Sequence, residues 1–219
     1  LEGVAAALAD DADLEVLVAG AADVVEPFAA SHERARPLVT TEVIEMSEHP
    51  ANAVRRKKDA SIVRAASAVR AGEADGLFSA GSTGAVLTAA TFGVGRIKGV
   101  KRPALCLPFP GISGRPTVFL DMGANADVKP DVMVQFAQMG RAYSRAVLGV
   151  ESPRVGLLCN GSEETKGSEM ALAYHAALEA GDCGFAGNAE GTDLLAGTFD
   201  VIVTDGFTGN VALKTIEGT

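Results

Sequence analysis

Three short apolar runs in this chain each end in a Gly-rich polar turn that opens a helix-like stretch. The turns read FSAGSTGA at 78–85, LDMGAN at 120–125 and VTDGFTGN at 203–210. In an open α/β sheet such turns lie at the carboxyl ends of parallel strands, where glycines let the backbone approach a ligand and free helix N–H groups point at it. The repetition therefore predicts an anion site, most simply for phosphate, on an α/β scaffold.

Strand and helix patterns alternate along the rest of the chain. The predicted strands are short apolar runs bounded by Gly, Pro or Asp, as in strands covered on both faces; they span 14–19, 39–44, 76–79, 104–107, 117–121, 154–159 and 199–204. The predicted helices span 21–30, 51–71, 82–97, 131–148, 168–179 and 208–217. This order predicts an α/β fold, a largely parallel sheet with helices on both faces in an αβα sandwich.

One segment departs from the alternation. Two runs within 104–120 are joined by a Pro- and Gly-rich turn at 108–115, which predicts a small hairpin-like insertion. No repeat of 20–50 residues and no low-complexity linker is visible, so we predict a single domain over 1–219. The first and last residues fall inside helical patterns, so we expect this domain to be incomplete at both ends.

Composition argues against several classes of protein. The formal net charge of −9 is unlike that of a general nucleic-acid binder. The longest near-apolar stretch, 84–95, is short of the roughly 20 residues of a membrane-spanning helix, and no secretory signal is visible, so we predict a cytoplasmic protein. Cys106, Cys159 and Cys183 lack metal-type spacing and are interpreted as buried structural thiols.

The turn at 79–85 is the first candidate for anion contact. Gly81 and Gly84 flank Ser82 and Thr83, whose hydroxyls can cap the next helix while backbone N–H groups bind an oxyanion. A plain helix cap explains Ser82 and Thr83 equally well.

A lysine inside the predicted helix over 51–71 is the second candidate. Lys58 falls on the apolar stripe of this helix, one turn from both Val54 and Ile62. An inward lysine must reach water or pair with an anion, so we predict Lys58 at the site. Snorkelling or a local kink in the helix is the alternative.

The polar loop NGSEETKG at 160–167 follows a predicted strand and concentrates an amide, two carboxylates and a lysine. It is not a Walker A loop, because its lysine precedes the second glycine. The glycines at 93, 95 and 99 follow a helix rather than a strand, which leaves NAD binding without support.

Other catalytic arrangements find no support in the residue spacing. His32, His49 and His175 are scattered and are interpreted as surface or capping residues, and no catalytic triad or zinc motif can be written. Aspartates at positions 121, 127, 193 and 205 could hold a divalent ion, although such residues more often cap turns. We therefore predict neither metal nor cofactor.

Two basic clusters stand out against the acidic background, RRKK at 55–58 and RIKGVKR at 96–102. Either could meet an acidic partner, and a solvated surface is the alternative.

Eight strings in one order resemble the PlsX family of bacterial phosphate acyltransferases. They are EMSEHP at 45–50, RKKDAS at 56–61, SAGSTG at 79–84, GRIKG at 95–99, DMGAN at 121–125, NGSEETKG at 160–167, GN at 187–188 and DGFTGN at 205–210. The resemblance is colinear over essentially the whole chain. This chain lacks the family's N-terminal strand with its Met-Gly-Gly-Asp motif and the family's C-terminal hydrophobic hairpin. Ser82 stands where the family often has Asn.

The resemblance implies an enzyme of phospholipid synthesis that moves a long-chain fatty acyl group from acyl carrier protein to inorganic phosphate, giving acyl phosphate. It also implies a homodimer, a fold similar to isocitrate and isopropylmalate dehydrogenases and to phosphotransacetylases, and peripheral association with the inner face of the cell membrane through the missing C-terminal segment. The alternatives are a phosphotransacetylase that uses acetyl-CoA and a non-catalytic phospho-ligand-binding domain.

This chemistry needs an anion cradle and oxyanion donors, because phosphate itself attacks the thioester. We assign phosphate binding to Lys58, Gly81, Ser82, Thr83, Gly84, Thr208, Gly209 and Asn210. Catalytic donors and charge stabilisers are predicted to be Asn125, Asn160 and Lys166. The acidic carrier protein is predicted to meet Arg55, Arg56, Lys57, Arg96, Lys98, Lys101 and Arg102.

Overall fold

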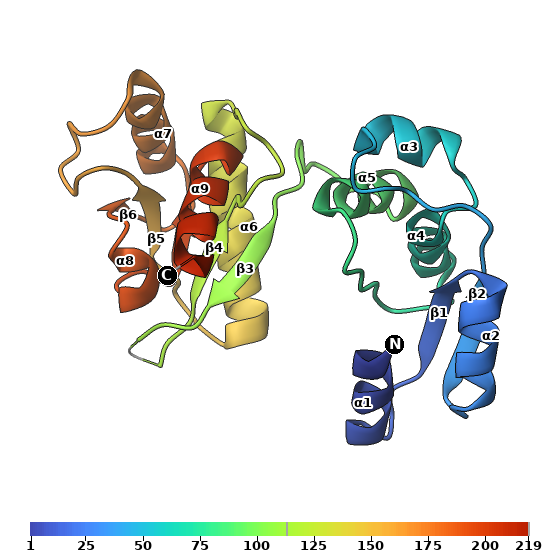
Figure 1. The fold of residues 1–219 in the computed structure, drawn as a ribbon. Coiled ribbons are helices and arrows are strands. Elements are labelled where there is room, and N and C mark those ends of the chain that lie inside the picture. Colours follow the sequence, from blue (N-terminus) through green and yellow to red (C-terminus); the bar gives the residue numbers. More distant parts are fainter. Residues whose placement is uncertain (113, 219) are drawn as a thin grey trace. The chain divides into compact units, whose positions relative to one another are not determined.

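A computed structural model describes residues 1–112 and 114–218 (Figure 1). The chain divides into two compact units, Leu1–Ile97 and Lys98–Thr219, and each has its own buried cores. The sequence-based assignment of the whole chain to one domain stays a prediction.

The first unit places helices around two short parallel strands (Figure 1). β1 (Val16–Gly20) pairs with β2 (Ala35–Val39), and α2 (Ala22–Ala30) connects them. Its other helices are α1 (Glu2–Asp10), α3 (Pro50–Arg56), α4 (Ser61–Ala71) and α5 (Thr83–Gly93).

Two small apolar cores hold the first unit together. Leu8, Val18 and Val25 join α1, β1 and α2, while Val54, Ala66 and Ala89 join α3, α4 and α5. These side chains are small, so the core of this unit depends on close helix approach rather than on large buried surfaces.

Three sequence predictions for the first unit are wrong. The second strand is Ala35–Val39 rather than 39–44, and residues 76–79 form no strand. The predicted helix over 51–71 is broken into α3 and α4. The break has a tertiary cause, since the Asp59 carboxylate accepts hydrogen bonds from the backbone N–H and hydroxyl of Thr41 at 2.8 and 2.7 Å.

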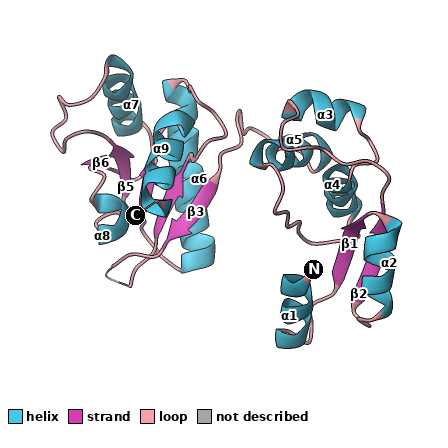
Figure 2. Cartoon of the chain, viewed as in Figure 1, coloured by secondary structure: helices cyan, strands magenta, loops and turns pink. Residues whose placement is uncertain are grey.

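The second unit is a five-stranded sheet in the order β3-β4-β7-β5-β6. β3 is antiparallel to β4, which confirms the hairpin-like insertion, and the other neighbours are parallel. The strands are β3 (Cys106–Phe109), β4 (Thr117–Leu120), β5 (Val155–Leu158), β6 (Phe185–Ala189) and β7 (Val201–Val203). The helices are α6 (Pro130–Leu148), α7 (Glu169–Ala180), α8 (Asp193–Ala196) and α9 (Gly206–Glu217), and Figure 2 shows their alternation with the strands.

Helices cover both faces of this sheet. Val118 and Val201 face one core, which includes Phe136 of α6 and Leu178 of α7. The intervening residues of the same strands face a second core with α8 and α9; they are Phe119 and Ile202. This alternation confirms the predicted α/β fold with a mostly parallel sheet and puts α7 and α9 on opposite faces.

No sequence pattern predicted β6 or α8. The strand FAGNA at 185–189 contains Gly187 and Asn188 and lacks a β-branched residue, so it has no strand-like pattern. Among the residues that the structure describes, no helix is both long enough and apolar enough to cross a membrane.

Candidate functional site

Polar loops follow three adjacent parallel strands of the second unit, β4, β7 and β5. The loops contain residues 121–129, 204–205 and 159–168. Because the carboxyl ends of parallel strands share one edge of a sheet, these loops gather where α/β proteins bind ligands.

A hollow of about 320 Å³ lies at this edge, at the end of β5. Its walls come from the end of β5, the loop that follows, the first turn of α7 and the first turn of α9; they are Leu158, Cys159, Asn160, Gly167, Ser168, Ala171 and Thr208. The hollow thus brings together two sequence-predicted residues that are 48 positions apart, Asn160 and Thr208.

The first turns of α7 and α9 both line the hollow, and the two helices cover opposite faces of the sheet. The Ser168 hydroxyl caps α7 by accepting from the N–H of Ala171 at 3.1 Å. The Asp205 carboxylate caps α9 by accepting from the N–H and hydroxyl of Thr208 at 2.8 and 3.0 Å. The remaining N–H groups of both first turns give the hollow a positive partial charge.

Each helix also carries a carboxylate at its start, Glu169 in α7 and Asp205 before α9. These negative charges complement the helix dipoles and offset part of the attraction for an anion. A full positive charge for the hollow must therefore come from a side chain, and the loop that forms one wall carries Lys166.

Lys166 is exposed, and its ammonium makes no hydrogen bond or ion pair with the described residues. Its backbone N–H donates to the carbonyl of Glu163 at 3.1 Å, and its aliphatic chain lies over Gly161. The next residue, Gly167, has φ +107°, and a Cβ there would lie 2.6 Å from that of Ala171. Glycine is therefore needed at the point where the loop turns into α7.

Asn160 is exposed at the hollow, and its amide oxygen lies 3.5 Å from the Cys159 sulfur. Its amide N–H groups have no partner among the described residues, so they are available as donors to a ligand.

Asn125 has a different environment. It is buried, and its amide nitrogen donates to the carbonyl of Pro103 and to the Asp121 carboxylate, both at 2.8 Å. Both amide hydrogens are thus engaged. This geometry supports a structural role for Asn125, and its catalytic role stays a prediction.

Asp121 organises the same loop. Its buried carboxylate accepts from the N–H groups of Leu105, Ala124 and Asn125 at 2.8 to 3.1 Å. Asp193 likewise accepts from the N–H of Glu190 at 2.8 Å. With the Asp205 cap, these contacts confirm that aspartates cap turns here, and no group of three metal-ligating side chains occurs within the described ranges.

Gly209 and Asn210 connect α9 to the loop after β4. A Cβ on Gly209 would lie 1.9 Å from the carbonyl oxygen of Asp121, so only glycine lets α9 approach this closely. The amide of Asn210 donates to the carbonyl of Met122 at 3.3 Å. Neither residue lines the hollow, and their part in phosphate binding stays a prediction.

In the first unit, the turn at 79–84 begins α5. Ser82 caps this helix by accepting from the N–H of Ala85 at 3.4 Å, which confirms the capping interpretation. A Cβ on Gly84 would lie 2.7 Å from Pro50 of α3, so Gly84 lets the starts of α3 and α5 approach each other. Gly81 and Thr83 are exposed, and phosphate contact at this turn stays a prediction.

The inward placement of Lys58 is wrong. α3 ends at Arg56, and Lys58 lies exposed in the turn before α4, with its ammonium 3.4 Å from the carbonyl oxygen of Val54. The structure instead shows the local break in the helix that was the alternative, between α3 and α4. The predicted phosphate residues are divided between the two units, so a single cradle made from all of them stays a prediction.

The first basic cluster borders a hollow of about 510 Å³, lined by Glu48, His49, Asn52, Arg55 and Arg56. Lys57 is turned inward and donates to Glu48 and to the carbonyl of Val43, both at 2.5 Å. The hydrogen bond from Lys57 holds the pKa of Glu48 below its ordinary value. Arg55 stacks over Phe92 and Arg56 pairs with Glu48 at 3.6 Å, while both side chains stay exposed, and contact of this cluster with a partner stays a prediction.

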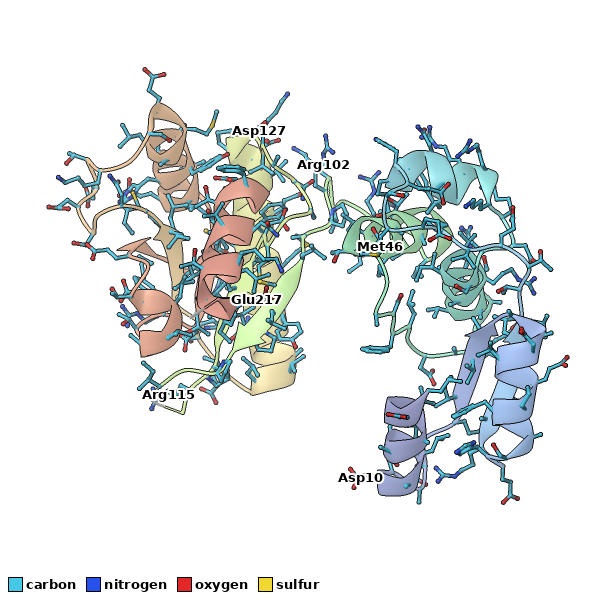
Figure 3. All side chains as sticks on the ribbon, viewed as in Figure 1. Asp10, Met46, Arg102, Arg115, Asp127 and Glu217 are labelled. Atoms are coloured by element: carbon cyan, nitrogen blue, oxygen red, sulfur yellow. The ribbon has the colours of Figure 1, made fainter. Side chains whose placement is uncertain are left out.

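The second basic cluster spans the boundary between the units, which falls after Ile97. Lys101 pairs with Asp131 at the start of α6, and this contact lowers the pKa of the Asp131 carboxyl. Lys98 and Arg102 are exposed, and Figure 3 shows the Arg102 side chain projecting from the segment before β3.

Sequence reasoning missed two buried polar residues behind the hollow. The amide nitrogen of Asn188 in β6 donates to the carbonyl of Glu163 at 2.9 Å, and its amide oxygen lies 2.9 Å from Nδ1 of His175. His175 is therefore a buried residue of α7, and its interpretation as a surface or capping residue is wrong. The pair Gly-Asn at 187–188 was the one signal that could have marked this contact.

The fold is that of the phosphotransacetylases. A phosphotransacetylase from Streptococcus pyogenes matches with a TM-score of 0.57 and 12% identity, over 93% of this chain and 82% of that one. A phosphotransacetylase from Staphylococcus aureus matches with a TM-score of 0.55 and 16% identity, over 93% of this chain and 82% of that one. At these identities the likeness defines the fold alone.

The family is defined by sequence. A family model described as "Fatty acid synthesis protein" matches residues 1–219, and the chain belongs to this family. Phosphate acyltransferases of Bacillus pumilus and Bacillus licheniformis are 47% and 49% identical to it, each over 100% of this chain and 66% of the relative. That of Leuconostoc citreum is 51% identical over 96% of this chain and 61% of the relative. The chain thus spans about two thirds of the length of the curated relatives it matches.

Proposed function

We propose that this chain belongs to a phosphate acyltransferase that transfers a long-chain fatty acyl group from acyl carrier protein to inorganic phosphate, giving acyl phosphate for phospholipid synthesis. The observation that carries the proposal is the hollow at the end of β5, where two helix N-termini meet the loop of Asn160 and Lys166. The names of the relatives support the same reaction.

In the proposed reaction, a phosphate oxygen attacks the thioester carbonyl carbon and forms a tetrahedral oxyanion. Collapse of this intermediate breaks the C–S bond, so that the acyl group leaves with phosphate and the carrier leaves as a thiolate that takes up a proton. Phosphate supplies the nucleophile, and the protein's contribution is to orient two anionic reactants and stabilise the developing charge.

The residues of the hollow suit these tasks. The free N–H groups at the starts of α7 and α9 can hold phosphate, and Thr208, whose hydroxyl hydrogen is donated to Asp205, lines the same hollow. The unpartnered amide of Asn160 can donate to the oxyanion, and Lys166 can offset the negative charge of the dianion. Leu158, Cys159 and Ala171 give the same hollow an apolar part suited to the acyl end of the donor.

The carrier protein is proposed to meet exposed basic residues of the two clusters, Arg55, Arg56, Arg96, Lys98 and Arg102. From the family resemblance we also propose a cytoplasmic homodimer that associates peripherally with the inner face of the membrane, and a fold related to the isocitrate and isopropylmalate dehydrogenases. Sedimentation and vesicle flotation of the full-length protein test the dimer and the membrane association.

The reaction is tested by incubating the full-length protein with radiolabelled phosphate and palmitoyl-acyl carrier protein, and in parallel with acetyl-CoA. We expect acyl phosphate from the carrier-protein donor. Product from acetyl-CoA alone would identify a short-chain phosphotransacetylase. Phosphate binding in calorimetry without product from either donor would identify a phospho-ligand-binding domain.

A further inference from the structure

A buried polar chain lies directly behind the loop 160–167. It runs from His175 in α7 to Asn188 in β6 and then to the backbone carbonyl of Glu163 in the loop, with two contacts of 2.9 Å. His175 is 8% exposed and Asn188 6% exposed, and neither lines the hollow. The contact to Glu163 is a tertiary hydrogen bond to the middle of this loop, between Asn160 and Lys166.

The chemistry of the groups fixes the direction of each hydrogen bond. A backbone carbonyl can only accept, so the Asn188 group that faces Glu163 is the amide nitrogen, and its oxygen faces His175. That oxygen can also only accept, so Nδ1 of His175 must carry a hydrogen. Both the neutral Nδ1–H tautomer and the imidazolium satisfy this requirement, so the chain keeps its polarity in either protonation state.

The surroundings hold His175 in place. Its ring meets the ring of Phe185 edge-on, with the centroids 4.9 Å apart, and its helix packs on the sheet through Leu178. His175 cannot turn away from Asn188 without losing this aromatic contact, and Asn188 cannot turn without leaving a buried amide unpaired, which is unfavourable.

We propose that Asn188 and His175 are positioning residues for the loop 160–167. Asn188 fixes the carbonyl of Glu163, His175 fixes the amide of Asn188, and the loop so anchored presents Asn160 and Lys166 to the hollow. The anchoring is independent of the reaction, whereas its effect on turnover rests on the proposed function. A displacement of about 1 Å in a positioned group can lower turnover on the order of 10²-fold.

The anchoring is tested without substrate by native-state trypsin cleavage after Lys166. Asn188→Leu removes both hydrogen bonds, and His175→Leu removes the donor to Asn188, so both should speed this cleavage at least about tenfold. His175→Asn keeps an N–H close to the position of Nδ1 and should restore slow cleavage.

Thr117→Val is the matched control. The buried hydroxyl of Thr117 donates to the carbonyl of Phe199 at 3.0 Å, at the start of β4 and therefore at the opposite edge of the sheet. This variant also loses one buried hydrogen bond to a backbone carbonyl, but it should leave cleavage after Lys166 unchanged. Equal acceleration in Thr117→Val, or none in Asn188→Leu and His175→Leu, would overturn the anchoring.

Turnover supplies the second measurement, in the full-length protein. The two leucine variants should lower kcat at least about tenfold with a smaller change in the KM for phosphate, and His175→Asn should recover most of kcat. If Asn188→Leu does not fold, the two His175 variants carry the same comparison. Faster cleavage with unchanged kcat in the leucine variants would overturn the positioning role. If the wild type makes no acyl phosphate and the leucine variants are still cleaved faster, the proposed function is contradicted and the anchoring of the loop is supported.

Discussion

At the scale of single residues, the polar side chains of the second unit fall into two groups. Some make hydrogen bonds that support the loops, and others are free to bind a ligand. The amide of Asn125 donates to a backbone carbonyl and to a buried carboxylate, and the amide of Asn210 donates to a backbone carbonyl. Asn160 and Lys166 have no such partner in the described part of the chain and lie at the hollow or in its loop. The free groups are therefore the better candidates for contact with the transition state.

We predict that Lys166→Ala lowers kcat for acyl phosphate formation on the order of 10²-fold, because removal of one transition-state donor typically has an effect of this size. Lys214→Ala is the matched control, since Lys214 is an exposed lysine of α9 that pairs with Glu217 at 2.5 Å. Steady-state kinetics of both variants makes the comparison. Near wild-type kcat in Lys166→Ala would remove the lysine from the reaction.

At the scale of secondary-structure elements, tertiary contacts decide where helices end and how closely they pack. The carboxylate of Asp59 stops the helical pattern between α3 and α4 by binding Thr41 and, at 2.6 Å, Arg64. In the second unit, α6 approaches the sheet through Gly140, where a Cβ would lie 2.4 Å from Val201 and 2.9 Å from Leu120.

The Asp59 contacts give a pH-dependent prediction. Hydrogen bonds from Thr41, and then from Arg64, lower the pKa of Asp59 in the folded protein, so its contribution to stability is present above the ordinary pKa of 3.8. The contribution is lost as the pH falls through the lowered value. We expect Asp59→Asn to unfold at lower urea concentration than wild type at pH 7, with a smaller difference at pH 3. An equal difference at both pH values would show that the charge of Asp59 is unimportant.

For α6, we predict that Gly140→Ala destabilises the protein by about 1–3 kcal/mol through overpacking, which outweighs the roughly 1 kcal/mol that alanine gains in helix propensity. Gly3→Ala in α1 is the matched control, because a Cβ there meets nothing within 4 Å. This change should stabilise the protein slightly. Denaturant unfolding measures both variants, and a stabilising Gly140→Ala would contradict the close packing of α6.

At the scale of the whole molecule, the charge distribution limits which basic residues can steer an acidic partner. The protein has a net charge of −9, and three of the seven predicted docking residues, Arg56, Lys57 and Lys101, pair with carboxylates of their own unit. Lys57 and Lys101 make the shorter of these ion pairs, so reversal of their charge would disturb their own unit as well as binding.

We predict that Lys98→Glu with Arg102→Glu raises the KM for acyl-acyl carrier protein several-fold and flattens its salt dependence, while the KM for phosphate changes little, because surface charges act mainly on association and are screened by salt. Arg36→Glu, an exposed reversal in β2, serves as the control. The same reversal of Arg55 and Arg56 tests the other cluster. An unchanged KM for the carrier protein in both double variants would place docking elsewhere.

The sequence alone determined the features of this protein that local patterns encode. The glycine-rich turns at 120–125 and 203–210 marked the polar edge of the sheet, whereas the one at 78–85 follows no strand, and helical patterns marked α6, α7 and α9. Tertiary structure decided the rest, because it depends on contacts between distant residues. The hydroxyl of Thr41 donates to Asp59 in the turn between α3 and α4, and the amide of Asn125 donates to Asp121. The amide of Asn188, which no sequence pattern marked, donates to the carbonyl of Glu163 and contacts His175. Such hydrogen bonds join groups that have no fixed spacing in sequence, so no periodicity reveals them.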